Sequence, residues 1–146
     1  MKKVRLEPIT PENFKECISL KVGDAQTKFV AANVTSIAQS KIYPTVEPMA
    51  VYAGEEMVGF VMFGLDEDDG RFYLVRLMID ERHQGKGYGR AATLEVIEKM
   101  RENAECREFY LSFVPENTAA EALYKSIGFE ATGEISEGET VMRFNL

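Results

Sequence analysis

Residues 80–90 read DERHQGKGYGR and place glycines at three alternate positions. The stretch follows the apolar run RFYLVRLMI (71–79) and precedes a segment of helical periodicity. Glycine inside a helix costs about 0.5–1 kcal/mol relative to alanine, so glycines at a helix start indicate close approach of the backbone to another group. Helix N-termini present unpaired N–H groups, and Arg82, Lys86 and Arg90 add positive charge here. The stretch predicts an anion site, with a solvated glycine-rich turn as the alternative.

Two common phosphate-binding motifs do not match this stretch. A Walker A loop requires G-x-x-x-x-G-K-[ST], and no Gly-Lys-Ser or Gly-Lys-Thr occurs in the chain. A dinucleotide fingerprint requires G-x-G-x-x-G, whereas the spacing here is G-x-G-x-G. Both ligand classes are therefore disfavoured.

The remainder of the chain predicts an α/β fold in which strands and helices alternate in the second half. Strands are expected at 4–9, 49–53, 56–65, 71–79, 107–114, 129–135 and 139–146. Helices are expected at 10–23, at 89–103 and within 115–129, and residues 24–43 are helical but less regular. Thr10 and Thr118 are placed to cap the first and last of these helices. Strand 71–79 is apolar on both faces, as in a central strand that is covered on both sides.

Composition favours a single domain over residues 1–146. The chain is 45% hydrophobic and carries 17 Lys and Arg against 24 Asp and Glu, a net charge of −7. This balance argues against nucleic acid as the partner, because phosphate neutralisation favours a basic surface. It permits a cationic ligand, or acidity that serves solubility alone.

Targeting and metal-binding signals are weak. The longest near-apolar run, MVGFVMFGL (57–65), is far shorter than the roughly 18 residues that span a bilayer, so no membrane partner is expected. The start MKKVRLEP lacks the apolar core of a signal peptide. Cys17 and Cys106 are far apart, which favours a reduced, cytoplasmic protein. With these two cysteines and one histidine, no metal site is expected.

Two separated motifs resemble the GNAT family of N-acetyltransferases. QGKGYG (84–89) matches that family's Q/R-x-x-G-x-G/A signature. ENTAAEALYKSIGF (116–129) is similar to its second motif, N-x-x-A-x-x-x-Y-x-x-x-G-F. The motifs and the expected elements follow the family's order over nearly the whole chain. More narrowly, most of residues 50–146 resemble small bacterial spermine/spermidine acetyltransferases.

The resemblance implies a mixed, splayed central sheet of the GNAT type, flanked by helices. It also implies acetyl-CoA as co-substrate between the parted strands, and direct acetyl transfer to an amine without an acyl-enzyme. The implied cofactor-binding residues are Leu77, Met78 and Ile79, through their backbone, then Gln84, Gly85, Lys86, Gly87, Tyr88, Gly89 and Arg90 as a pyrophosphate loop, and Asn117 beside the pantetheine arm. Tyr124 is the implied catalytic residue, whose hydroxyl protonates the leaving thiolate.

Each of these residues also has a structural interpretation. The side chains of 77–79 suit a plain core, Asn117 suits a helix start, and Tyr124 shares an apolar helical face with Leu123 and Ile127. The general base is not fixed by the sequence. Its candidates are Glu47, Asp66, Glu67, Asp80 and Glu81, with His83 a weaker one.

The narrower resemblance implies a small-molecule amine as acceptor, a spermine or spermidine. The alternatives are a protein N-terminus or another small amine, or a non-catalytic module that senses coenzyme A. The acidic turn DEDDG (66–70) is either a solvated hairpin turn or a rim that attracts a polycation, and residues 24–43 are expected to cover the acceptor. The resemblance also allows a homodimer, because members of that family are often dimers.

Overall fold

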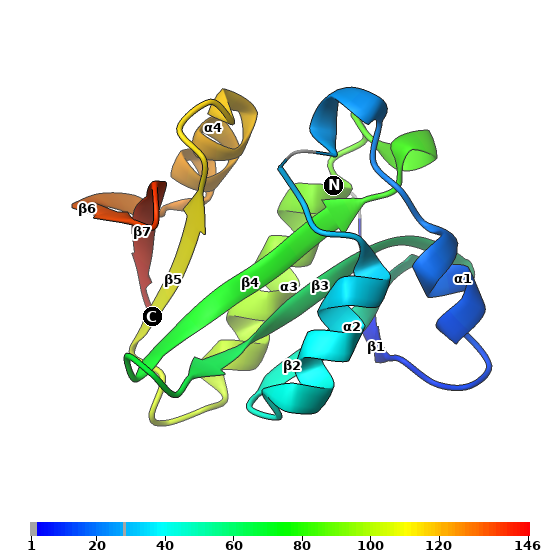
Figure 1. Ribbon diagram of the computed structural model, residues 1–146, viewed down its shortest axis with the longest axis horizontal. Coiled ribbons are helices and arrows are strands. Elements are labelled where there is room, and N and C mark those ends of the chain that lie inside the picture. The colour runs from blue at the N-terminus through cyan, green and yellow to red at the C-terminus, as the bar shows by residue number, and fades with distance from the viewer. Residues whose placement is uncertain (1–2, 28) are drawn as a thin grey trace.

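The computed structural model describes residues 3–27 and 29–146 (Figure 1). Its strands are β1 Arg5–Pro8, β2 Val46–Ala53, β3 Glu56–Asp66, β4 Arg71–Ile79, β5 Glu108–Phe113, β6 Glu130–Ser136 and β7 Glu139–Asn145. Its α-helices are α1 Phe14–Ser19, α2 Asn33–Ile42, α3 Tyr88–Arg101 and α4 Thr118–Ile127, with short 3-10 turns at Asp24–Gln26 and Glu81–His83. This order agrees with the predicted alternation of strands and helices.

The strands form one mixed sheet in the order β1-β2-β3-β4-β5-β7-β6. Every neighbouring pair is antiparallel except β4 and β5. These two pair in parallel at only two positions, Phe72 with Phe109 and Tyr73 with Tyr110. Beyond them the strands part, and Figure 1 shows the resulting gap between the ribbons of β4 and β5. The mixed, splayed α/β sheet predicted above is confirmed.

A β-bulge in β4 changes which side chains face each side of the sheet. The register moves from Leu74 opposite Phe63 to Arg76 opposite Met62, which leaves Val75 as the extra residue. Leu74 packs in the cluster that includes side chains of α3 and α4, whereas Val75 packs in the cluster that includes α1. The bulge thus re-aims the side chains of the strand that borders the gap.

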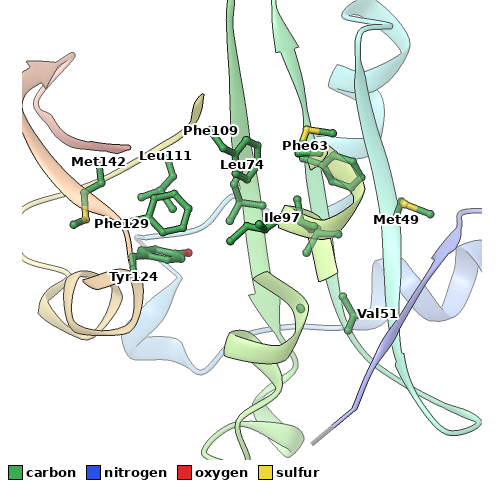
Figure 2. Close-up of a cluster of buried hydrophobic side chains, with 14 of the residues drawn as sticks. Met49, Val51, Phe63, Leu74, Ile97, Phe109, Leu111, Tyr124, Phe129 and Met142 are labelled. Atoms are coloured by element: carbon green, nitrogen blue, oxygen red, sulfur yellow. The ribbon is translucent and has the colours of Figure 1, made fainter. Parts of the chain in front are cut away.

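The core is divided between the two faces of the sheet. Figure 2 shows the larger cluster, in which Leu74 and Ile97 lie on one side and Leu111, Phe129 and Met142 on the other. A second cluster is built around Cys17 and Phe60, under α1 and α2. Both cysteines are buried free thiols. Helices on both faces therefore hold the two halves of the sheet while its centre stays parted.

The first helix is shorter than predicted. The expectation of a helix over 10–23 capped by Thr10 is wrong: α1 has six residues and its N-cap is Asn13. The chain leaves the helix early because Lys21 is tied to the end of β4, where its N–H donates to the Asp80 carboxylate at 3.0 Å. Of the apolar side chains Phe14, Cys17 and Ile18 in this helix, only Cys17 is buried.

Two further expectations need correction. The N-cap of α4 is Asn117 rather than Thr118. In β4 only Leu74 and Met78 are fully buried, so this central strand is not covered on both sides along its length. The cause is the separation from β5, which leaves β4 beside an opening. No helix among residues 3–27 and 29–146 is both long and apolar enough to cross a membrane.

Candidate active site

Two cavities meet where β4 and β5 part. The larger has a volume of about 1140 Å³ and the smaller about 430 Å³. Both are lined by Phe29, Val30, Leu77, Asn117, Ala120 and Tyr124. A molecule that reaches through the parted sheet would therefore contact the same side chains from either cavity.

The smaller cavity gathers most of the predicted site residues. Those that line it are Leu77, Met78, Ile79, Gln84, Gly85, Gly87, Tyr88, Gly89, Asn117 and Tyr124. Lys86 and Arg90 belong to the same loop but do not line this cavity, and both are exposed. The structure thus brings together two motifs that lie far apart in the sequence.

The glycine stretch forms a tight loop that ends in a helix N-terminus. Gly85 and Gly87 have φ of 76° and 87°, values that glycine adopts readily and L-residues avoid. Gly87 is the N-cap of the 14-residue helix α3 and supplies no side-chain cap. The first N–H groups of a helix have no partner within it and lie at the positive end of its dipole. The loop is therefore suited to bind an anion through its backbone.

The Gln84 side chain holds this loop against the end of β4. Its Nε2 donates to the Ile79 carbonyl and to Gln26 Oε1, each at 2.9 Å. Gln84 lines the smaller cavity, but its amide is already engaged with protein atoms. Its observed role is to fix the loop, and Gln26 is a partner that the sequence analysis did not identify.

The charges around the loop are arranged differently from the sequence expectation. Arg82 is not a free cation, because its Nε is paired with the Asp80 carboxylate at 2.7 Å. Asp80 is almost fully buried and also accepts from the N–H groups of Lys21 and Arg82. Burial raises the pKa of Asp80, but these hydrogen bonds outweigh it and hold the pKa below its usual value. Asp80 is thus a structural carboxylate, and its candidacy as a general base is not supported.

The end of β4 presents backbone beside the loop. Leu77, Met78 and Ile79 lie past the last pairing of β4 with β5, while their other edge pairs with β3. Gly59 on β3 stands opposite Ile79, and a Cβ at Gly59 would collide with the Met78 carbonyl. A strand edge without a partner strand offers hydrogen bonds to an extended ligand.

Tyr124 lies at the junction of the two cavities. Its ring centroid is 6.3 Å from that of Phe113 and 5.6 Å from that of Phe129, and only 9% of the residue is exposed. In Figure 2 its hydroxyl points toward the side where Leu74 and Ile97 lie. That hydroxyl has no hydrogen-bond partner among the residues the structure describes. Burial raises the pKa of Tyr124 well above its usual value, so the hydroxyl stays protonated at neutral pH.

Asn117 begins the helix that carries Tyr124. Its Oδ1 accepts from the Ala120 N–H at 3.2 Å, which confirms the structural interpretation of this residue. Its side chain also borders both cavities. Since the cap occupies the oxygen, the amide nitrogen is the group left to contact a ligand.

The larger cavity is acidic. Among the described residues that line it, six carry a carboxylate and only Arg76 carries a positive charge. The carboxylates are Asp66, Glu67, Asp68, Asp69, Glu137 and Glu139. They come from the end of β3 and the turn after it, and from the turn between β6 and β7 and the start of β7, so both halves of the parted sheet contribute to one cavity. Residues 66–69 of the acidic turn therefore border the larger cavity.

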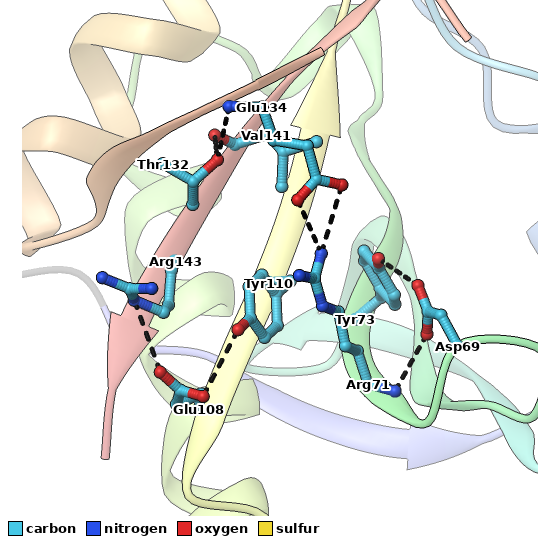
Figure 3. Close-up of polar contacts among 9 residues, drawn as sticks. All are labelled: Asp69, Arg71, Tyr73, Glu108, Tyr110, Thr132, Glu134, Val141 and Arg143. Carbon is cyan, nitrogen blue, oxygen red and sulfur yellow. Dashed lines mark hydrogen bonds and ion pairs between the residues drawn. The ribbon is translucent and has the colours of Figure 1, made fainter. Parts of the chain in front are cut away.

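A polar network fixes the acidic turn where β4 and β5 still pair (Figure 3). Tyr73 donates its hydroxyl to Asp69 Oδ2 at 2.6 Å. The Arg71 guanidinium pairs with Glu134 on β6 and lies over the Tyr110 ring on β5. Burial and the hydrogen bond to Asp69 raise the pKa of Tyr73 to about 12. The network joins β4, β5 and β6 at the closed end of the split.

Two further polar residues of the larger cavity were missed by the sequence analysis. Arg76 donates to Gln39 Oε1 at 3.3 Å, and its buried Nε has no partner among the residues described. Glu139 accepts from the Ser112 hydroxyl at 2.7 Å. Neither carries a local sequence signal, because Arg76 lies inside an apolar run and Glu139 follows an ordinary turn. Only the pairing of distant strands brings them here.

A comparison with protein-family models matches residues 16–129 to the acetyltransferase (GNAT) family. That span is well over half of the chain and contains both motifs, the acidic turn and Tyr124. The chain belongs to the GNAT acetyltransferase family. It is therefore an acetyltransferase by family, as the two motifs indicated.

Relatives of this GNAT protein support the narrower resemblance as well. A spermine/spermidine N(1)-acetyltransferase of Bacillus subtilis (strain 168) is 33% identical over 95% of this chain and 96% of its own length. Among solved structures, an aminoglycoside acetyltransferase in complex with coenzyme A superposes with a TM-score of 0.81 at 16% identity, covering 98% of this chain and 95% of its own. An acetyltransferase of Thermus thermophilus gives 0.74 at 22% identity and full coverage of both chains. These two structures establish the likeness of fold.

Proposed function

We propose that this GNAT protein transfers the acetyl group of acetyl-CoA to a primary amine of a polyamine, with spermine or spermidine as the acceptor. The observation that carries the proposal is the acidic larger cavity, which meets the loop-lined smaller cavity at Tyr124. A polyamine is a flexible chain of cations, and carboxylates along one cavity attract it at several points. The spermine/spermidine acetyltransferase relative supports the same acceptor class.

Acetyl-CoA is assigned to the smaller cavity. The glycine loop and the N-terminus of α3 suit a pyrophosphate, which backbone N–H groups and the helix dipole stabilise. The free edge of β4 at Leu77–Ile79 suits the pantetheine amides, and the Asn117 amide nitrogen is close by. Lys86 and Arg90, exposed on the same loop, are placed to contact outer phosphates. The coenzyme A bound in the aminoglycoside acetyltransferase structure supports this assignment.

Tyr124 is assigned the role of acid. When the amine attacks the thioester carbonyl, the departing sulfur becomes a thiolate that needs a hydrogen-bond donor. A backbone N–H near Met78, on the edge of β4 that faces the gap, is proposed to polarise the carbonyl oxygen. The Tyr124 hydroxyl is protonated, unpartnered among the described residues and at the cavity junction, so it is placed to stabilise the thiolate and protonate it. The acetyl group passes directly to the amine, and no acyl-enzyme forms.

The acceptor class predicts a distinctive response to salt. Raising ionic strength from about 0.02 M to about 0.2 M is expected to raise KM for spermine roughly tenfold and KM for propylamine about twofold, because screening acts on each substrate charge. Steady-state thiol release at each salt concentration measures both constants. Glu67→Gln with Asp68→Asn removes two carboxylates of the exposed turn and should flatten the spermine response. Equal responses of the two amines would exclude electrostatic recognition of a polycation.

Two other expectations from the sequence stay predictions of the same proposal. The resemblance allows a homodimer, and sedimentation equilibrium of the purified protein tests it. A cytoplasmic location is expected from the two free thiols, and cell fractionation tests it.

A further inference from the structure

Glu139 is a carboxylate held in position at the start of β7. Its Oε1 accepts from the Ser112 hydroxyl on β5 at 2.7 Å, and its side chain lines the larger cavity together with Tyr124. It is partly buried, unlike Glu137 two residues earlier, which is exposed. No Lys, Arg or His within residues 3–27 and 29–146 forms an ion pair with it. The second carboxylate oxygen is therefore available to a ligand in the cavity.

Glu139 and Tyr124 lie on opposite sides of the same end of β5. Phe113 pairs with Thr140, the residue after Glu139, and its ring contacts Tyr124. Ser112 precedes Phe113 and, because strand side chains alternate, points to the other face of the sheet, where it meets Glu139. Since β4 has parted from β5 at this level, groups on both faces can reach the gap. Tyr124, the proposed acid, thus lies on one side of the opening and the Glu139 carboxylate on the other.

The other carboxylates are less suitable as proton acceptors. Asp80 is buried in its bonds to Lys21 and Arg82, and Asp69 is occupied by Tyr73. Asp66, Glu67 and Asp68 lie on the turn at the far end of β4, where β4 and β5 still pair. Glu47 and Glu81 do not line either cavity. Glu139 is the carboxylate that is both fixed and beside the end of β5 that contacts Tyr124.

We propose that the Glu139 carboxylate, oriented by Ser112, binds the acceptor ammonium and accepts the proton that the nitrogen must lose before it attacks. This role rests on the proposed amine acetyltransferase activity. The N–H bond breaks toward Glu139, and the freed lone pair forms the N–C bond to the thioester carbonyl. The C–S bond then breaks, the sulfur takes the Tyr124 proton, and the second nitrogen proton restores the tyrosine. The proton on Glu139 leaves to solvent at the cavity mouth, so the sum is ammonium plus acetyl-CoA to amide, free thiol and one proton.

The test is the pH dependence of Glu139→Gln with spermine as acceptor. Near pH 7 its kcat is expected to be about 100-fold below wild type, because general base catalysis is lost. The deficit in kcat should shrink steadily toward pH 10, where roughly a quarter of an amine with a pKa of about 10.4 is already neutral and needs no base. Ser112→Ala leaves the carboxylate in place but loosens it, so a smaller deficit of roughly fivefold with the same pH trend is expected. If Glu139 had a purely structural role, the kcat deficits of both variants would not change with pH.

Two matched variants separate the base from general charge effects. Glu137→Gln removes the same charge from the same cavity and should raise KM for spermine while kcat is kept. Glu130→Gln removes an exposed charge outside both cavities and should leave both constants unchanged. Acetyl-CoA binding and Tm of Glu139→Gln are expected to equal those of wild type.

The outcomes distinguish this inference from the proposed function. A wild-type protein that acetylates no amine would overturn the proposed function, and the role of Glu139 would fall with it. A wild type that acetylates spermine, beside a Glu139→Gln variant whose kcat is unchanged near pH 7 or whose deficit is constant with pH, would overturn only the assignment of Glu139.

Discussion

Replacing Tyr124 by phenylalanine is expected to lower kcat about 1000-fold while the Kd of acetyl-CoA stays within about twofold. The ring fills the space between Phe113 and Phe129, and phenylalanine keeps those contacts. The hydroxyl has no protein partner among the described residues, so its removal leaves no buried group unsatisfied. The loss therefore falls on the leaving thiolate, which is left without a proton donor.

Tyr110→Phe is the matched control for this variant. Tyr110 is also a buried tyrosine, but its hydroxyl bonds to Glu108 and it lines neither cavity. It should retain kcat and lose only a small part of the free energy of unfolding, about 1 kcal/mol for one hydrogen bond. Stopped-flow thiol release for both variants, with acetyl-CoA affinity measured by calorimetry, separates turnover from binding. A Tyr124→Phe enzyme with wild-type kcat would remove the tyrosine from the mechanism.

Replacing Gly87 by valine is expected to weaken acetyl-CoA binding about 1000-fold, which corresponds to two charge-assisted hydrogen bonds of about 2 kcal/mol each. Gly87 has φ of 87° and forms the N-cap of α3, so a β-branched side chain distorts the backbone at the start of the helix. The N–H groups that follow then lose their alignment toward the pyrophosphate. Isothermal titration with acetyl-CoA and with coenzyme A measures the loss.

Gly54→Val controls for backbone strain. Gly54 also has positive φ, 62°, but it lies in the turn between β2 and β3 with open space around its Cα and outside both cavities. Both valines should lower the free energy of unfolding by roughly 1–3 kcal/mol. Only Gly87→Val should lose affinity for acetyl-CoA. Equal affinity losses, or none at Gly87, would mean that the glycine loop does not hold the co-substrate.

The features predicted well from sequence are those with a local physical cause. The glycine spacing at 85–89 predicted that the backbone there approaches another group closely, and Gly85 and Gly87 do have positive φ. Periodicity located α3 and α4 to within a few residues. The two motifs identified the family because each combines helix-start chemistry with small residues at fixed spacing. Their meeting around Tyr124 follows from the β4–β5 crossover, which the order of elements implied.

The features that sequence could not supply depend on distant partners. The early end of α1 is due to the bonds that Lys21 makes with Asp80 and Glu81, about 60 residues later. The sequence counts Arg82 among the positive charges of the loop, because its pairing with a buried Asp80 depends on how the chain turns after β4. Glu139 was not among the candidates for the base, because nothing local distinguishes it from the other acidic residues. Strand register, rather than a local pattern, places it beside the larger cavity.

The most direct test of the account is acetyl-CoA consumption by the purified protein against a panel of amines. The panel contains spermine, spermidine, putrescine, an aminoglycoside, lysine and a peptide with a free N-terminus, with thiol release as the readout and product mass as confirmation. The account predicts that spermine or spermidine is turned over with kcat/KM at least about 100-fold above every other amine, a difference of about 2.7 kcal/mol. Equal or greater turnover of the peptide or the aminoglycoside would contradict the polyamine assignment. Binding of acetyl-CoA with no turnover of any amine would contradict the catalytic account and favour a sensor of coenzyme A.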